Sequence, residues 1–186
     1  MNSWEDMGIN NATRIDVGPD GIAWVIREGS IFHLTNLGDW EQVEGNAIDI
    51  GVGANGQVWA ISPEGKIYRQ YVNSSGSLWQ DMEGTATRID VDRNGLAWVV
   101  QADGRIYNSH GVPGGWTAVP GLATDIGIGA DGDVWMTRKG DGAIHRWNAD
   151  QAHWEMTDGN AAQITVDQNG TPWVVQENTI IWTLAQ

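Results

Sequence analysis

Residues Trp40 to Trp59 read WEQVEGNAIDIGVGANGQVW. This stretch opens with a tryptophan phrase, continues through alternating residues around Ile50, turns at Asn55-Gly56 and ends at a second tryptophan. An Asn-Gly pair between apolar runs is a strong signal for a tight β-hairpin, because both residues tolerate positive φ. The stretch therefore predicts antiparallel strands joined by a short turn.

The same pattern occurs five times in one register along the chain. The opening tryptophans are Trp4, Trp40, Trp79, Trp116 and Trp154, at spacings of 36, 39, 37 and 38 residues. The second tryptophans are Trp24, Trp59, Trp98, Trp135 and Trp173. The turn pairs are Asp20-Gly21, Asn55-Gly56, Asn94-Gly95, Asp131-Gly132 and Asn169-Gly170. Self-similarity at a fixed period is the signature of a repeat architecture.

Each unit contains four short strand patterns. In the first unit the expected strands cover residues 13–17, 22–26, 31–34 and 40–43. Units of roughly 37 residues are too small to bury their own faces and match the blades of a propeller. Residues 1–186 are therefore predicted to form one all-β domain, a five-bladed β-propeller with four antiparallel strands per blade.

The two ends of the chain predict how the ring closes. From Trp154 to Gln186 there are 33 residues, so the fifth unit lacks its outer strand. The segment from Trp4 to Met7 repeats the phrase of that strand and is expected to complete the blade built from residues 161–184. The ring is then closed by the N-terminal strand joining the C-terminal blade, which leaves no unpartnered edge.

Two positions alternate between units. The first reads Arg14, Asp49, Arg88, Asp125 and Gln163, and the second reads Asp16, Gly51, Asp90, Gly127 and Thr165. Strict alternation in an odd ring would set like charges together at the closing junction, and there the sequence supplies Gln163 and Thr165 instead. Two interpretations remain open: contacts between neighbouring blades, or independent drift on solvated edges.

Composition excludes several function classes. With 10 Lys and Arg against 24 Asp and Glu, the formal net charge is -14, which disfavours nucleic acid and anionic lipid as partners. No apolar run reaches the roughly 20 residues of a membrane span, and no secretory signal is evident, so we expect no membrane insertion and a cytoplasmic protein. There are no cysteines and no catalytic motif, so we expect neither an enzyme nor a cofactor.

The phrase Trp-x-x-Val-x-Gly-x-Ala-x-Asp-Ile-x-Val-Gly-x-Asn-Gly-x-Val-Trp, written out by the stretch from Trp40 to Trp59, resembles the tectonin repeat. The resemblance covers essentially the whole chain. It implies a β-propeller lectin that binds neutral glycans, including O-methylated ones, in defence or in recognition of foreign cells. Family members commonly have six repeats, whereas this chain has five, so the number of sites does not carry over.

The candidate glycan-binding residues are of two kinds. Aromatic rings can stack on the C–H faces of a sugar, and planar amides, carboxylates and guanidinium groups can pair with adjacent hydroxyls. The candidates are Trp4, Trp40, Trp79, Trp116, Trp154, Arg14, Asn46, Asp49, Arg88, Asp125, Asn160 and Gln163. The competing interpretations are core packing for the tryptophans and a solvated rim for the polar residues. The second tryptophans are assigned to the core, and the extra pair Trp147 and Trp182 either decorates single sites or packs.

The residues leave two further alternatives, a calcium site and a different function. The run from Asp90 to Asn94 has the opening of a calcium loop, but Gln101 stands where the bidentate Glu is needed, so a hairpin turn is favoured and no metal is expected. The runner-up function is a protein-interaction scaffold that uses one propeller face. Recurrence of site-like residues around the ring favours the lectin.

Overall fold

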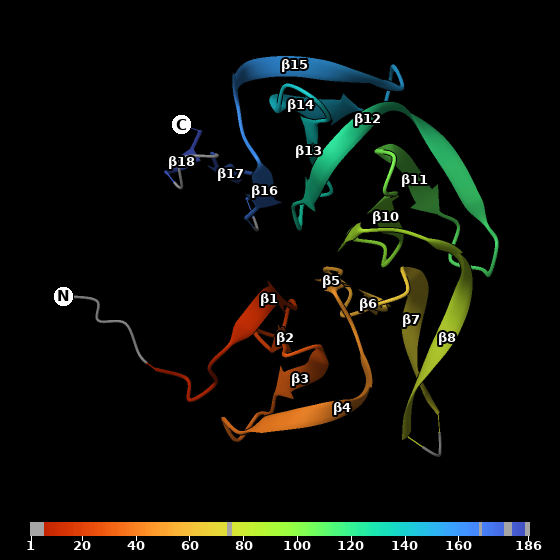
Figure 1. The fold of residues 1–186 in the computed structure, drawn as a ribbon, viewed down its shortest axis with the longest axis vertical. Helices are drawn as coiled ribbons and strands as arrows, with labels where there is room; N and C mark the ends of the chain where they lie inside the picture. The colour runs from red at the N-terminus through yellow and green to blue at the C-terminus, as the bar shows by residue number, and fades with distance from the viewer. Residues whose placement is uncertain (1–5, 74–75, 168, 177–179, 185–186) are drawn as a thin grey trace.

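The computed structural model describes residues 6–73, 76–167, 169–176 and 180–184. Its described part is built from strands and turns, and the sheets are arranged around a common centre (Figure 1). Within these residues there is no helix long and apolar enough to cross a membrane.

The strands follow the repeat of the sequence. Unit 1 is an antiparallel sheet of β1 (Ala12–Val17), β2 (Ala23–Arg27), β3 (Ser30–Leu34) and β4 (Trp40–Asn46). Unit 2 has the same order in β5 (Asp49–Val52), β6 (Val58–Ile61), β7 (Lys66–Asn73) and β8 (Gly76–Thr85). The strands predicted for the first unit are confirmed to within three residues at each end.

The next seven strands form one continuous sheet. They are β9 (Arg88–Val91), β10 (Ala97–Val100), β11 (Arg105–Ser109), β12 (Trp116–Ile128), β13 (Val134–Arg138), β14 (Ala143–Asn148) and β15 (His153–Asn160). The long strand β12 is the outer strand of unit 3 in its first half and the inner strand of unit 4 in its second half. Unit 5 comprises β16 (Gln163–Val166), β17 (Pro172–Val175) and β18 (Ile181–Thr183).

The Asx-Gly pairs make the predicted turns. In unit 2 the N–H of Gly53 donates to the carbonyl of Gln57 at 2.9 Å, and the side-chain oxygen of Asn55 accepts from the N–H of Gln57 at 3.0 Å. The glycine of the pair, Gly56, has a φ of 80°, which L side chains adopt only with strain. Each turn therefore brings the inner two strands of its unit into register.

The core lies between neighbouring units. Trp59 of β6 is fully buried in a cluster that also contains residues of β9 and β10, and its indole N–H donates to the carbonyl of Gly95 at 3.0 Å. Trp98 and Trp135 are also buried, as predicted for the second tryptophans. Trp24 is half-buried, and Trp173, which lines the cavity between units 5 and 1, is 42% exposed.

A repeated contact ties each outer strand to the unit before it. The pairing of β3 with β4 shifts at a bulge that contains Glu44 and Gly45, so the carbonyl of Glu44 is free to accept a hydrogen bond from outside its sheet. The indole N–H of Trp79, from the next outer strand, donates to that carbonyl at 2.7 Å. Trp116 donates likewise to the carbonyl of Glu83 at 2.7 Å, and Trp154 donates to the carbonyl of Pro120 at 2.6 Å.

The first and last units face each other across an open seam (Figure 1). Here Ile15 and Ile181 are 67% and 65% exposed, whereas their repeat counterparts Ile50 and Ile67 are buried. Asp6 and Met7 form no strand, and Trp4 and Glu5 lie outside the described residues. The count of five blades and the closure by the N-terminal strand therefore stay predictions.

Candidate functional site

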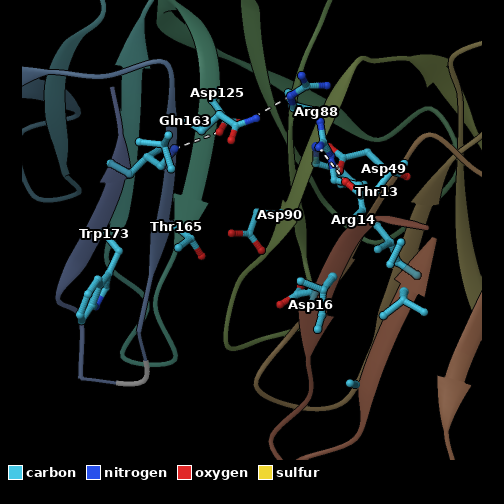
Figure 2. A pocket seen from close by; sticks show the side chains of 18 of the residues that line it. Thr13, Arg14, Asp16, Asp49, Arg88, Asp90, Asp125, Gln163, Thr165 and Trp173 are labelled. Atoms are coloured by element: carbon cyan, nitrogen blue, oxygen red, sulfur yellow. Dashed lines mark hydrogen bonds and ion pairs between the residues drawn. The ribbon is translucent and has the colours of Figure 1, made fainter. Parts of the chain in front are cut away.

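The structure places the predicted polar candidates in two separate regions. Five of them line a central cavity of about 660 Å³, into which strands of all five units contribute (Figure 2). These five are Arg14, Asp49, Arg88, Asp125 and Gln163. Asn46 and Asn160 lie farther out, in two grooves between neighbouring units. The polar candidates are thus divided between the centre of the ring and the two grooves farther out.

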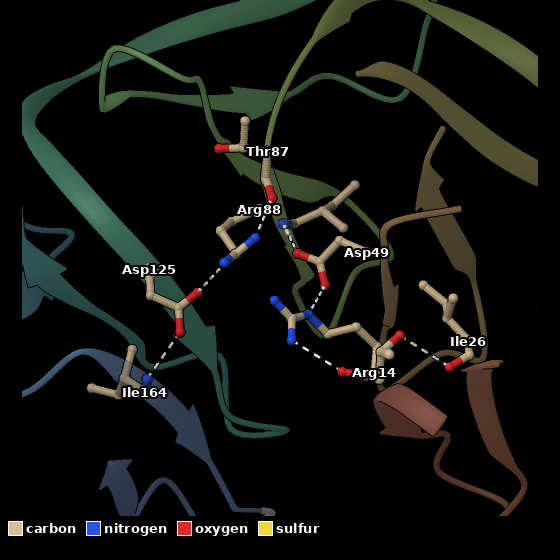
Figure 3. A network of polar contacts seen from close by, with 9 residues as sticks. Arg14, Ile26, Asp49, Thr87, Arg88, Asp125 and Ile164 are labelled. Atoms are coloured by element: carbon tan, nitrogen blue, oxygen red, sulfur yellow. Dashed lines mark hydrogen bonds and ion pairs between the residues drawn. The ribbon is translucent and has the colours of Figure 1, made fainter. Parts of the chain in front are cut away.

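The central charges join one unit to the next. The Nε of Arg14 donates to Oδ1 of Asp49 at 3.0 Å, and Oδ2 of Asp49 accepts from the N–H of Ile89 at 3.0 Å (Figure 3). The same arrangement recurs two units on, where Arg88 lies 3.5 Å from Asp125, and Asp125 accepts from the N–H of Ile164 at 3.0 Å. Alternation at this position reflects contacts between blades, not drift on solvated edges.

The second alternating position works in the same way. Oδ2 of Asp16 accepts from the N–H of Val52 at 2.6 Å. Gly51, the partner position, has no room for a side chain, since a Cβ there would lie 3.1 Å from the Cα of Asp90. The contacts recur two units on, at Asp90, Ile128, Gly127 and Thr165.

Burial dominates the electrostatics of the central carboxylates. It raises the pKa of Asp16 and of Asp125 to about 6, although backbone N–H donors oppose the shift. Burial also raises the pKa of Asp49 and, more strongly, that of Asp90, to which the charge of Asp16 adds. Each of these carboxylates accepts hydrogen bonds from backbone N–H groups or pairs with an arginine. The described polar groups of the central cavity therefore hold the units together.

The first groove lies between units 1 and 2 and has a volume of about 500 Å³. Trp79 forms one wall, and its bond to the carbonyl of Glu44 fixes the ring in place. Tyr68 and Asn46 line the same groove, so it offers an aromatic surface, a phenol and an amide to one ligand. Its full lining is Ile31, Glu44, Gly45, Asn46, Ala60, Ser62, Pro63, Glu64, Tyr68, Leu78 and Trp79.

The second groove lies between units 4 and 5 and has a volume of about 280 Å³. It occupies the equivalent place in the repeat. The counterparts in the two grooves are Ile31 and Ile144, Glu44 and Asp158, Gly45 and Gly159, Asn46 and Asn160, Ala60 and Val174, Ser62 and Gln176, and Tyr68 and Trp182. Both grooves thus combine an asparagine amide, a carboxylate and an aromatic residue.

The opening tryptophans differ in what surrounds them. Trp116 packs edge-on against Trp59 with ring centroids 6.0 Å apart, and Trp154 packs against Trp147 at 5.0 Å. Trp40 lines the central cavity, and its indole N–H donates to the carbonyl of Met7 at 2.8 Å. Trp79 is the opening tryptophan that lines an inter-unit groove in the described part of the chain, and Trp4 falls outside that part.

Sequence reasoning missed several groove residues. Tyr68, Leu78, Ser62 and Gln176 were not singled out, and Trp182 was noted only as an extra tryptophan outside the repeat. The signal was present, because the register of β17 with β18 gives Trp182 the place that Tyr68 holds in unit 2. Locating both required the strand pairing, since no motif marks them.

The turn that begins at Asp90 uses its carboxylates separately. Asp90 lines the central cavity and accepts a hydrogen bond from the N–H of Ile128. Oδ1 of Asp92 instead accepts from the N–H groups of Asn94 and Leu96, at 2.8 and 2.9 Å. Among the residues that the structure describes, no group of three or more His, Asp or Glu side chains is arranged to hold a metal ion.

Comparison with known proteins identifies the family. A family model described as the tectonin domain matches residues 1–82, 33–115 and 85–186, which together span the chain. The chain belongs to the tectonin family. A search of curated protein sequences found no match.

Solved structures similar to this tectonin-family chain are propellers of diverse activity. The β-propeller domain of Swd1 from Myceliophteria thermophila is 11% identical with a TM-score of 0.71, covering 93% of this chain and 64% of that one. Virginiamycin B lyase from Staphylococcus aureus is 15% identical with a TM-score of 0.59, covering 94% and 70%. A gluconolactonase from Xanthomonas campestris is 16% identical with a TM-score of 0.68, covering 92% and 71%. The fold is therefore a β-propeller, and the chain spans only part of these neighbours' length.

Proposed function

We propose that this tectonin-family protein is a lectin that binds neutral glycans in its two equivalent inter-unit grooves. The observation that carries the proposal is the recurrence of one set of groups, an asparagine, a carboxylate and an aromatic ring, in both grooves. Membership of the family points to glycan or protein binding, and this recurrence favours the glycan.

The chemistry of the first groove suits a sugar. The amide of Asn46 offers one acceptor and two donors for adjacent hydroxyls, and it makes no side-chain hydrogen bond within the described part of the chain. Trp79 and Leu78 offer apolar surface to the C–H face of a sugar ring. The same apolar walls accommodate an O-methyl group, which would be poorly solvated in water.

The proposal includes a closed ring of five blades. The exposed seam residues Ile15, Trp173 and Ile181 have repeat counterparts that are buried between blades, which supports closure of unit 5 on unit 1. Burial of such side chains stabilises a protein by roughly 1.5 to 3 kcal/mol each. A closed ring holds both grooves on one rigid body, where a surface carrying several sugars can engage them together.

A glycan array with methylated and unmethylated members is the first test, followed by calorimetry with the best monosaccharide. We expect a stoichiometry near two per chain and a dissociation constant of the order of 1 mM per site. Asn46→Ala and Asn160→Ala should each remove one site and leave the affinity of the other unchanged.

The matched control is Thr85→Ala. Thr85 follows Gly84 as Asn46 follows Gly45, but Thr85 lines neither of the two grooves. This variant should bind the monosaccharide like the parent. An array with no hits, or Asn46→Ala and Asn160→Ala variants that bind normally, would contradict the proposal and favour a scaffold that binds protein through one face.

The proposal also covers what the protein does not do. We propose a binding protein located in the cytoplasm, with neither catalysis nor a cofactor. In support, the central carboxylates with raised pKa are engaged by Arg14, Arg88 and backbone N–H groups of neighbouring units. Turnover of a bound glycan or lactone by the purified protein would contradict this part.

A further inference from the structure

The two grooves differ in size although they offer the same kinds of polar group. The groove between units 1 and 2 has a volume of about 500 Å³, and the groove between units 4 and 5 has a volume of about 280 Å³. Both present an asparagine amide, Asn46 in the first and Asn160 in the second. Sites with the same hydrogen-bonding groups but different volumes accept ligands of different size.

Two positions on the second strand of each unit narrow the second groove. Ala60 and Ser62 are two residues apart at the end of β6, and both line the first groove. Their repeat counterparts at the end of β17 are Val174 and Gln176, and both line the second groove. Because both counterparts have larger side chains, they occupy space that stays open between units 1 and 2.

The junctions between units 2 and 3 and between units 3 and 4 also have larger side chains at these positions. They are Val99, Gln101, Met136 and Arg138, and they line none of the three cavities described above. The terminal methyl of Met136 lies 3.6 Å from where a Cβ on Gly121, in the bulge of β12, would lie. At Gly45, the corresponding bulge glycine, the three nearest atoms belong to Trp79 and Ile31. The space that Met136 fills is therefore left open above Ala60.

We propose that Ala60 and Ser62 give the first groove room for a neutral glycan of two linked sugar rings. In the second groove, Val174 and Gln176 leave room for a single ring. The inference rests on the sugar binding proposed above and adds the length of glycan that each groove accepts. One ring lies against Trp79 in the first groove, and the space above the two small side chains admits the next ring.

The surroundings of the small side chains suit a second ring. The Oγ of Ser62 donates to Oε2 of Glu64 at 2.9 Å and accepts from the N–H of Lys66 at 3.3 Å, so Ser62 serves the groove by its small size. The second carboxylate oxygen of Glu64, Oε1, can accept from a sugar hydroxyl. Pro63 and Leu78 line the same groove and add apolar surface for the C–H face of the second ring.

The repeat shows that the fold tolerates an exchange of these side chains. The N–H of Ser62 donates to the carbonyl of Lys66 at 2.9 Å, and the N–H of Gln101 donates to the carbonyl of Arg105 at the same distance. The same turn thus forms with either side chain at this position. The double variant Ala60→Val/Ser62→Gln should therefore fold like the parent.

The test is calorimetry on the full chain with two ligands, the best monosaccharide from the array and the disaccharide that carries it at the non-reducing end. The parent should bind the monosaccharide with a stoichiometry near two and the disaccharide with a stoichiometry near one. Ala60→Val/Ser62→Gln should weaken disaccharide binding at least about tenfold and leave the monosaccharide stoichiometry near two. Val174→Ala/Gln176→Ser should raise the disaccharide stoichiometry to near two.

The matched control is Ile61→Val, which changes the opposite face of β6 in the core shared with unit 3 and should leave both stoichiometries unchanged. A disaccharide stoichiometry of two in the parent would overturn the size assignment and leave the glycan proposal standing. Unchanged disaccharide affinity in Ala60→Val/Ser62→Gln would do the same. Absence of binding of either sugar to the parent would instead remove the glycan proposal and the size assignment with it.

Discussion

A single carboxylate, that of Asp49 in unit 2, bonds to the units on both sides of its own. It belongs to β5, accepts from Arg14 of unit 1 and accepts from the N–H of Ile89 in unit 3, while only 5% of its surface is exposed. Burial alone would favour the neutral form of the Asp49 carboxyl. The two hydrogen-bond donors stabilise its charged form. The side chain therefore acts as a joint between blades.

We predict that Asp49→Ala lowers the free energy of unfolding by about 3 to 5 kcal/mol, because it removes the acceptor of the Nε of Arg14 and of the buried N–H of Ile89. Urea unfolding measures the loss. Asp39→Ala, at an exposed position in the loop before β4, is the control and should change stability by less than about 0.5 kcal/mol. Equal stability of the two variants would show that the contacts of Asp49 do not hold the units together.

The raised pKa of Asp125 predicts how stability depends on pH. Burial lifts this pKa from 3.8 to about 6, so between these pH values the folded chain binds more protons than the unfolded chain. The resulting stabilisation is complete below 3.8 and is lost as the pH rises through 6. The unfolding free energy should therefore increase between pH 7.5 and pH 4.5, by roughly 2 kcal/mol from this group.

Asp125→Asn isolates the contribution of this carboxyl. The amide keeps an oxygen that can accept from the N–H of Ile164, but it does not titrate, so the rise in stability should be shallower than in the parent. Asp39→Asn should leave the rise unchanged. An identical pH profile in parent and Asp125→Asn would mean that other groups account for the dependence.

At the scale of strands, the hairpins and the inter-blade tryptophans were predictable from the sequence, because their signals are local. Asn55-Gly56 predicts a turn because of its backbone preference, and the recurring spacing of Trp40 and Trp59 predicts a repeat. The grooves were not predictable. Tyr68 and Asn46 come from different units and line one groove, and no local pattern marks them as neighbours.

The bulge carbonyls lead to a prediction for outer strands. Trp116→Phe keeps an aromatic ring at this position but loses the hydrogen bond to the carbonyl of Glu83, and it should cost about 1 kcal/mol or somewhat more for the smaller ring. Trp116→Ala removes the ring and should cost roughly 3 to 5 kcal/mol. Thermal unfolding compares the two, and equal losses would argue that the hydrogen bond alone holds the strand.

At the scale of the whole molecule, the net charge of -14 shapes which ligands can approach. A neutral sugar in the grooves is held by hydroxyl hydrogen bonds and apolar contact, which salt screens little. We predict that the dissociation constant changes by less than about twofold between low and high ionic strength. Calorimetry at both extremes measures this, and a steep loss of affinity with salt would indicate a charged ligand instead.

The long strand β12 makes the connection between units 3 and 4 stiffer than the other connections in the ring. It pairs with β11 from Trp116 and with β13 from Ala123 to Ile128, so one uninterrupted backbone crosses from unit 3 into unit 4. The side chain of Lys139 reinforces the crossing by donating to the carbonyl of Ala102 at 3.0 Å. A force applied along the chain is therefore transmitted directly through this strand. We expect units 3 and 4, which the strand joins, to move as one rigid body. We expect relative motion of the units to be greatest at the open seam between the first and last units, which no shared strand crosses in the described part of the chain.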